Sequence, residues 1–222
     1  MWRDALLMAG KDLRVEARSR VAIGQVAPFA VIVLVLFAFA LDPSRGILVK
    51  AAAGLFWVAV LFSALLTVQR SFAIEAADGA RDGLRLSGLD PAGIFLGKAL
   101  AVAAELFVLE IVLGAGVVVL YNAPIHGYLL LLATCVVATV GMASAGTIYG
   151  GLAVGLRVRE TLLPLLTLPV LAPVLLAATE ASQAALDGVP GQGVAWLRLL
   201  GVFAAIYLTF GVLAFGSLLE ES

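Results

Sequence analysis

Cysteine and histidine are almost absent from the 222-residue sequence, which has only Cys135 and His126. A disulfide within the chain is therefore impossible, and no paired cysteine or histidine spacing typical of a metal site occurs. No serine, histidine and acid set can form around a lone histidine, and no Gly-x-x-x-x-Gly-Lys-Ser/Thr phosphate-binding loop is present. We therefore expect neither enzymatic activity nor ATP hydrolysis from this chain alone, and no stably bound cofactor or metal.

Charge is also scarce, at 13% of residues against about 25% in an ordinary soluble domain. Hydrophobic residues make up 63%, and mean hydropathy is +1.11. A hydrocarbon core about 30 Å thick needs about 20 mostly apolar residues per helical crossing. Six runs qualify: 21–41, 47–68, 93–120, 128–156, 161–178 and 194–219. They predict one all-α integral membrane domain over residues 1–222, in contact with the lipid bilayer through most of its length.

Lysine and arginine are distributed unevenly among the connections between these runs. One side of the predicted bundle carries Arg3, Lys11, Arg14, Arg18, Arg20, Arg70, Arg81, Arg85, Arg157 and Arg159. The other side has only Arg45, Lys50 and Arg198 nearby. The positive-inside rule therefore predicts that both termini and the 69–92 connection lie in the cytoplasm. Because the basic residues flank the membrane without interleaved aromatic residues, nucleic-acid binding is not supported.

The first twenty residues place Trp2, Leu6, Ala9 and Leu13 at helical spacing, with charged residues largely elsewhere around the helix. This pattern predicts an amphipathic helix over residues 1–20 that lies in the membrane interface. A solvated charged tail is the alternative.

Residues 70–91, RSFAIEAADGARDGLRLSGLDP, carry seven charged residues, whereas residues 51–68 carry none. Mixed charges on a short helix would give an orientation-specific surface for another protein. The candidate docking residues are Arg70, Glu75, Asp78, Arg81, Asp82 and Arg85. An ordinary solvated loop explains the composition about equally well.

Three charged residues, Lys98, Glu105 and Glu110, lie inside the third run, where ionised side chains should face protein or water. Lys98 can instead snorkel to the cytoplasmic interface. For Glu105 and Glu110, a functional or subunit-contact role and a structural hydrogen-bonding role both stay open.

Glycines and prolines mark the fourth and fifth runs. The pairs Gly146 with Gly150 and Gly151 with Gly155 should let other helices approach closely. Three prolines, Pro164, Pro169 and Pro173, should kink or break the fifth helix, and are candidates for gating. Residues 178–193 are expected to form an external loop with a short surface helix. The external turn YNAPIHG contains His126, for which a polar loop residue is a better interpretation than a haem ligand.

Three blocks resemble one known family: KDLRVEARSR (11–20), LFWVAVLFSALLTVQRSFAIEAADGARDGLRLSGLDPAGIFLGK (55–98) and LPLLTLPVLAPVLLAAT (163–179). The sequence is similar there to the haem exporter protein B (CcmB) family, and length and six-span layout agree over essentially the whole chain. The resemblance implies an ABC-2-type permease-like subunit in the cytoplasmic (inner) membrane, working in c-type cytochrome biogenesis. The 69–92 segment would couple it to the ATPase subunit CcmA.

The resemblance also implies the membrane partners CcmC and CcmD and the haem chaperone CcmE. The cargo question stays open between haem export and ATP-driven release of haem-loaded chaperone. Two alternatives are a permease exporting a lipid, drug or polysaccharide, and a membrane assembly scaffold without transport activity. An intramembrane enzyme built on Glu105 and Glu110 is disfavoured because the sequence offers no nucleophile, metal set or suitably spaced acid pair.

Overall fold

The computed structural model describes residues 1–19, 22–41, 46–76, 88–154 and 159–221. Within these ranges the regular structure is helical. The helices are α1 (Trp2–Ser19), a π-helical turn η1 (Ala22–Val26), α2 (Ala27–Ala40), α3 (Ile47–Ala76), α5 (Pro91–Tyr121), α6 (Tyr128–Val154), α7 (Arg159–Leu186) and α8 (Pro190–Glu221). The all-helical prediction is confirmed for the described part of the chain.

Five helices, α3 and α5 to α8, are long and apolar enough to cross a membrane. They confirm the predicted spans that begin at residues 47, 93, 128, 161 and 194. Helix α2 has only 14 residues, about 21 Å at 1.5 Å per residue. The number of candidate spans rises to six only if α1 and α2 together form one span, and the two helices are bent by 53° relative to each other. The structure therefore supports an integral membrane protein with at least five candidate spans.

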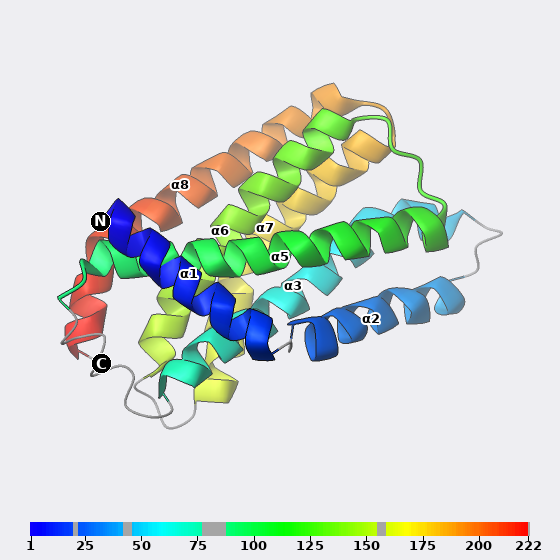
Figure 1. The fold of residues 1–222 in the computed structure, drawn as a ribbon. Helices are drawn as coiled ribbons and strands as arrows, with labels where there is room; N and C mark the ends of the chain where they lie inside the picture. The colour runs from blue at the N-terminus through cyan, green and yellow to red at the C-terminus, as the bar shows by residue number, and fades with distance from the viewer. Residues whose placement is uncertain (20–21, 42–45, 77–87, 155–158, 222) are drawn as a thin grey trace.

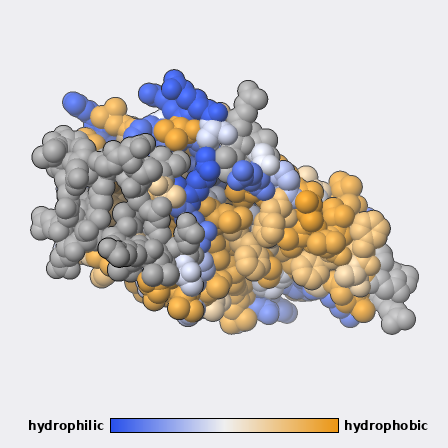
Figure 2. Space-filling model, turned by 90° about the horizontal axis from the view of Figure 1, so that it is seen from below, coloured by the Kyte–Doolittle hydropathy of each residue, from blue (hydrophilic) through white to orange (hydrophobic). Residues whose placement is uncertain are grey.

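The helices run back and forth between two ends of one bundle (Figure 1). The N-terminus, the last turns of α3, α6 and α8, and the first turns of α5 and α7 gather at one end. The loop 122–127 and the turn between α7 and α8 lie at the opposite end. Hydrophilic residues concentrate toward one end of the face in Figure 2, and a broad hydrophobic region covers much of the rest.

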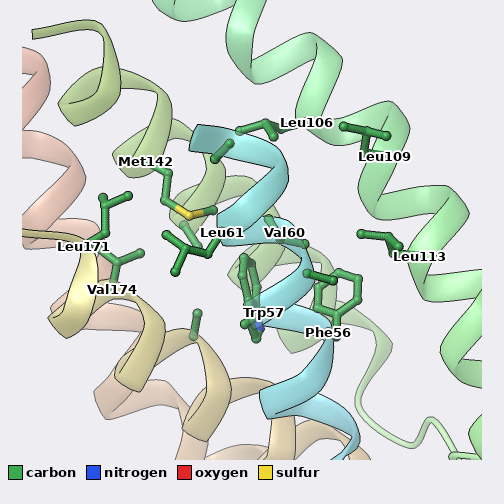
Figure 3. Close-up of a cluster of buried hydrophobic side chains, with 14 of the residues drawn as sticks. Phe56, Trp57, Val60, Leu61, Leu106, Leu109, Leu113, Met142, Leu171 and Val174 are labelled. Atoms are coloured by element: carbon green, nitrogen blue, oxygen red, sulfur yellow. The ribbon is translucent and has the colours of Figure 1, made fainter. Parts of the chain in front are cut away.

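Helix α3 is the centre of the core. Its Phe56, Trp57, Val60 and Leu61 face leucines of α5, Met142 of α6 and two residues of α7 (Figure 3). The Trp57 indole N–H donates to Ser182 Oγ of α7 at 2.9 Å, so this buried donor has a partner. Tyr121 OH donates to the Leu34 carbonyl at 2.9 Å and joins α5 to α2.

The predicted small-residue contacts on α6 are confirmed where they are described. A Cβ atom at Gly146 would lie 2.7 Å from Val68 of α3, and Gly150 packs directly on the Phe72 ring of α3. On another side of α6, a Cβ at Gly151 would lie 3.1 Å from Phe215 of α8. Gly155 lies outside the described residues. Helix α6 is thus held against two neighbours by glycine faces.

Two features of α7 differ from the prediction. The helix is continuous through Pro164, Pro169 and Pro173, so the prolines do not break it, and a kink at these positions stays a prediction. Pro169 and Pro173 lie on an exposed face, and local backbone adjustment lets membrane helices accommodate proline. Residues 178–186 are not an external loop but the last turns of α7, because their alanines, including Ala181 and Ala185, are buried against the bundle.

Candidate functional site

Two glycines let α1 lie directly on α5. A Cβ atom at Gly97 would lie 2.6 Å from the Ala5 carbonyl oxygen and 2.6 Å from Met8 Cβ, and one at Gly93 would lie 2.9 Å from Asp4 Cβ. Only a residue without a side chain permits such backbone proximity. This Gly-x-x-x-Gly pair was missed in the sequence, although its spacing is that of the pairs recognised on the fourth span.

The side of α1 that faces α5 differs in part from the predicted interfacial stripe. Ala5, Met8 and Ala9 are buried, so Ala9 belongs to the protein contact and not to the lipid-facing surface. Trp2, Leu6 and Leu13 are exposed, as the interfacial-helix prediction requires. One face of α1 therefore packs on protein, while a neighbouring apolar face is open.

Lys98 connects α1, α3 and α5. Its side chain is 1% exposed, and Nζ lies 3.3 Å from Asp12 Oδ2 of α1 and 3.4 Å from Ser71 Oγ of α3. Nζ also lies 4.6 Å from the centre of the Phe72 ring. The snorkelling prediction is wrong, because an acidic residue of α1 and an aromatic ring of α3 satisfy the ammonium inside the protein.

A second ion pair joins α1 to α3, between Glu16 Oε2 and Arg70 Nε at 3.2 Å. Arg70, one of the predicted docking residues, thus has an acidic partner within the chain through Nε, and its docking role stays a prediction. Together, Asp12 and Glu16 of α1, Arg70, Ser71 and Phe72 of α3, and Gly97 and Lys98 of α5 form one cluster. We call this cluster the α1 junction.

The N-terminal end of α1 is also tied to the start of α5. The Met1 ammonium lies 3.2 Å from Asp4 Oδ2 and 3.4 Å from Asp90 Oδ2. Asp90 caps α5, because its Oδ1 accepts a hydrogen bond from the Ala92 N–H at 3.0 Å. The hydrogen bond to Asp4 raises the pKa of the Met1 amine, and the same contact lowers the pKa of Asp4.

The α1 junction flanks the segment in which docking was predicted. Helix α3 continues to Ala76 and α5 begins at Pro91, so Arg70 and Glu75 belong to α3 and not to a separate loop. The Glu75 side chain and residues Asp78, Arg81, Asp82 and Arg85 lie outside the described part of the chain. Their docking role stays a prediction.

A cavity of about 690 Å³ opens beside Arg70, between η1, α2, α3, α6 and α7. Its lining is mostly apolar and includes Phe29, Phe62 and Leu168, with Gln25 and Arg70 as polar contributions. Pro164 lies in its wall, whereas neither Pro169 nor Pro173 does. Pro164 is thus the gating candidate that borders this cavity.

The remaining candidates, Glu105, Glu110 and His126, lie in different surroundings. Glu105 is half-buried, whereas Glu110 is buried and accepts a hydrogen bond from the Thr139 hydroxyl of α6. His126 is exposed in the 122–127 loop, whose backbone N–H groups at His126 and Gly127 donate to the Ala185 carbonyl at 3.3 and 2.9 Å. Among the described residues, no group of three His, Cys, Asp or Glu side chains is placed to hold a metal.

Comparison with known proteins gives a consistent result over nearly the whole chain. The family model described as CcmB protein matches residues 3–222. Heme exporter protein B of Rhodobacter capsulatus is 31% identical over 208 residues, covering 89% of this chain and 90% of that protein. The proteins of the same name from Paracoccus denitrificans and Escherichia coli are 33% and 30% identical, covering 77% and 95% of this chain and 78% and 95% of their own lengths.

Proposed function

Since the chain belongs to the CcmB family, we propose that it is the membrane subunit of an ATP-driven haem exporter in c-type cytochrome biogenesis. In this proposal a separate ATPase subunit, CcmA, docks at the end of the bundle that holds the α1 junction. That end faces the cytoplasm and carries both termini. The chain is a transport subunit and not itself a catalytic enzyme.

The observation that carries the proposal is the position of the α1 junction. The segment 77–87 is flanked by α3 and α5, and α1 is joined to both helices: Glu16 pairs with Arg70 and Asp12 with Lys98. A force applied to this segment would therefore move α1 and the ends of both helices together. Rigid-body displacement of packed helices is an established way of changing a transport path.

The finer architecture belongs to the same proposal. We infer a six-span, ABC-2-type arrangement in the inner membrane, in which α2 and the residues before it supply the first crossing and α1 lies in the interface. CcmC, CcmD and the chaperone CcmE are the proposed membrane partners. Haem is the proposed cargo, and release of haem-loaded chaperone is the alternative use of the same movement.

The docking site is tested by reversing two charges together, Arg81→Glu and Asp82→Arg. We expect co-purification of the ATPase subunit from mild detergent to fall, while membrane insertion of the variant is unchanged. The matched control is Lys50→Glu, an exposed change near the start of α3, toward the opposite end of the bundle. ATPase recovery equal to that of the parent chain would contradict the docking proposal.

The cargo is tested separately with the complex reconstituted in proteoliposomes. ATP-dependent appearance of haem on the side opposite the ATPase supports export. ATP-dependent release of haem-loaded CcmE from CcmC without haem crossing supports the alternative.

A further inference from the structure

A second cavity lies toward the other end of the bundle and takes no part in the proposed coupling. It has a volume of about 300 Å³ and lies between α3, α5, α6 and α7, with part of the 122–127 loop in its wall. Ala53, Phe56, Ala115, Ile125 and Leu186 are among its apolar lining residues. Such a volume is at the lower limit for small-molecule sites.

Glu110 supplies an unused acceptor to this cavity. Its side chain is 5% exposed, and one carboxyl oxygen, Oε1, accepts the Thr139 hydroxyl. The Cys135 thiol, a weak donor, is within hydrogen-bonding reach of the same carboxyl. The other oxygen, Oε2, is buried and has no hydrogen-bond partner among the described residues. Buried carboxyl oxygens are normally satisfied, so Oε2 is available to accept a hydrogen bond from a molecule in the cavity.

Comparison with Lys98 shows that Glu110 lacks a cationic partner among the described residues. Lys98 and Glu110 are the two buried charged side chains in the described part of the chain. Lys98 has an ion pair with Asp12, whereas no described cation lies within ion-pair distance of Glu110. Ionisable groups inside membrane bundles are generally paired or face a cavity, and Glu110 faces one.

The cavity can be reached from the bilayer along one face of α5. Ile111 and Val118 of its lining are 73% and 42% exposed, and a Cβ atom at Gly114 would meet nothing within 4 Å. A ligand dissolved in the hydrocarbon can therefore enter sideways, past residues that present only apolar atoms.

We propose that this cavity binds a small lipophilic amine. The ligand's N–H group donates to Oε2 of Glu110, and its apolar body, about one ring in size, contacts Phe56, Ala115 and Ile125. The volume favours such a molecule over a macrocycle such as haem. The proposal does not depend on the transport function proposed above.

The test uses Trp57 as a reporter, because its indole N–H bonds to Ser182, which itself lines the cavity. The chain has three tryptophans, so the parent protein for the test is the Trp2→Phe, Trp196→Phe variant in lipid nanodiscs. The probe is 4-bromophenethylamine, whose bromine quenches indole fluorescence at short range. We expect saturable quenching, in addition to the linear quenching caused by partition into the bilayer.

The Glu110→Leu variant should weaken the saturable phase by about tenfold or more, because the hydrogen bond from the probe's ammonium group, as a bond with one charged partner, contributes about 1.5–3 kcal/mol. Glu105→Gln, on the same helix but outside the cavity lining, should bind like the parent. Ala115→Phe tests the site without touching Glu110. Ala115 is exposed, so a ring there narrows the entrance without disturbing the core, and the saturable phase should again be lost.

Three outcomes would overturn the proposal. The first is quenching in the parent chain that is linear only, which would mean that the cavity is filled by lipid or does not bind the probe. The second is equal affinity in the Glu110→Leu and parent proteins. The third is equal saturable quenching by 4-bromoethylbenzene, which lacks the amine and would show that apolar contact alone accounts for binding.

Discussion

Replacing Asp12 by leucine is expected to release α1 from the bundle. Asp12 places a carboxylate oxygen 3.3 Å from Lys98 Nζ, and the Lys98 side chain is 1% exposed. Removing one partner of a buried ion pair costs about 3–5 kcal/mol. The Phe72 ring 4.6 Å from Nζ offsets about 1–2 kcal/mol of this. A net loss of about 2–3 kcal/mol corresponds to an increase of about 30- to 150-fold in the undocked population.

Replacing Lys98, the other partner of this ion pair, should increase the undocked population less. The Lys98→Met variant leaves Asp12 13% exposed and still 2.9 Å from Lys11, so we expect less than about fivefold undocking. The assay is the rate of trypsin cleavage after Arg14, which is exposed on α1. When α1 redocks faster than trypsin cuts, this rate reports the undocked population.

The control is Lys11→Met, which removes an exposed cation from the same carboxylate and should cleave at nearly the parent rate. The Asp12→Leu, Lys98→Met double variant should be more resistant than Asp12→Leu alone, because the buried ammonium that pairs with Asp12 is then removed together with it. Two results would refute the assignment of Lys98 as the anchor of α1. One is cleavage of Asp12→Leu at the parent rate, and the other is a double variant that is cleaved as fast as Asp12→Leu.

Two further predictions concern the same helix. Gly97→Ala on α5 should displace α1, because the new Cβ would meet the Ala5 backbone at 2.6 Å. Overpacking of this kind costs about 1–3 kcal/mol, so trypsin should cleave α1 faster. Gly114→Ala, also on α5 but with open space around it, should be cleaved at the parent rate. The ion pair between the Met1 amine and Asp4 should be fully formed at pH values between the ordinary pKa of an aspartate and the ordinary pKa of an α-amine. It should be lost as pH falls through the lowered pKa of Asp4, and also as pH rises through the raised pKa of the amine. Acylation of the Met1 amine at mildly alkaline pH should accordingly be faster in Asp4→Asn than in the parent, and equal rates would contradict that contact.

Much of the fold follows from hydrophobic runs, since a span needs only length and apolarity to be recognised. The run 93–120 corresponds to α5, Pro91–Tyr121, within a few residues. The errors arose where neighbours decide the outcome. Residues 178–186 were interpreted as a polar loop because Glu180, Ser182 and Gln183 interrupt the run, yet the alanines around these residues are buried and continue α7.

The α1 junction was only partly predictable. The charged residues of 11–20 and the lysine of the third span were visible in the sequence, and Lys98 was recognised as unusual. Their pairing was not, because Asp12 and Lys98 are separated by 86 residues and their contact depends on where α1 crosses α5. The glycine spacing at Gly93 and Gly97 was the available signal for that crossing.

The position of Phe72 limits which substitutions this protein can tolerate nearby. Its ring fills the space that Gly150 leaves on α6 and at the same time lies beneath the ammonium of Lys98. A larger residue at position 150 would push the ring, and an aliphatic residue at 72 would leave the lysine without its aromatic partner. Positions 72, 98 and 150 are therefore mutually constrained, and a change at one should be tolerated best when the other two change with it.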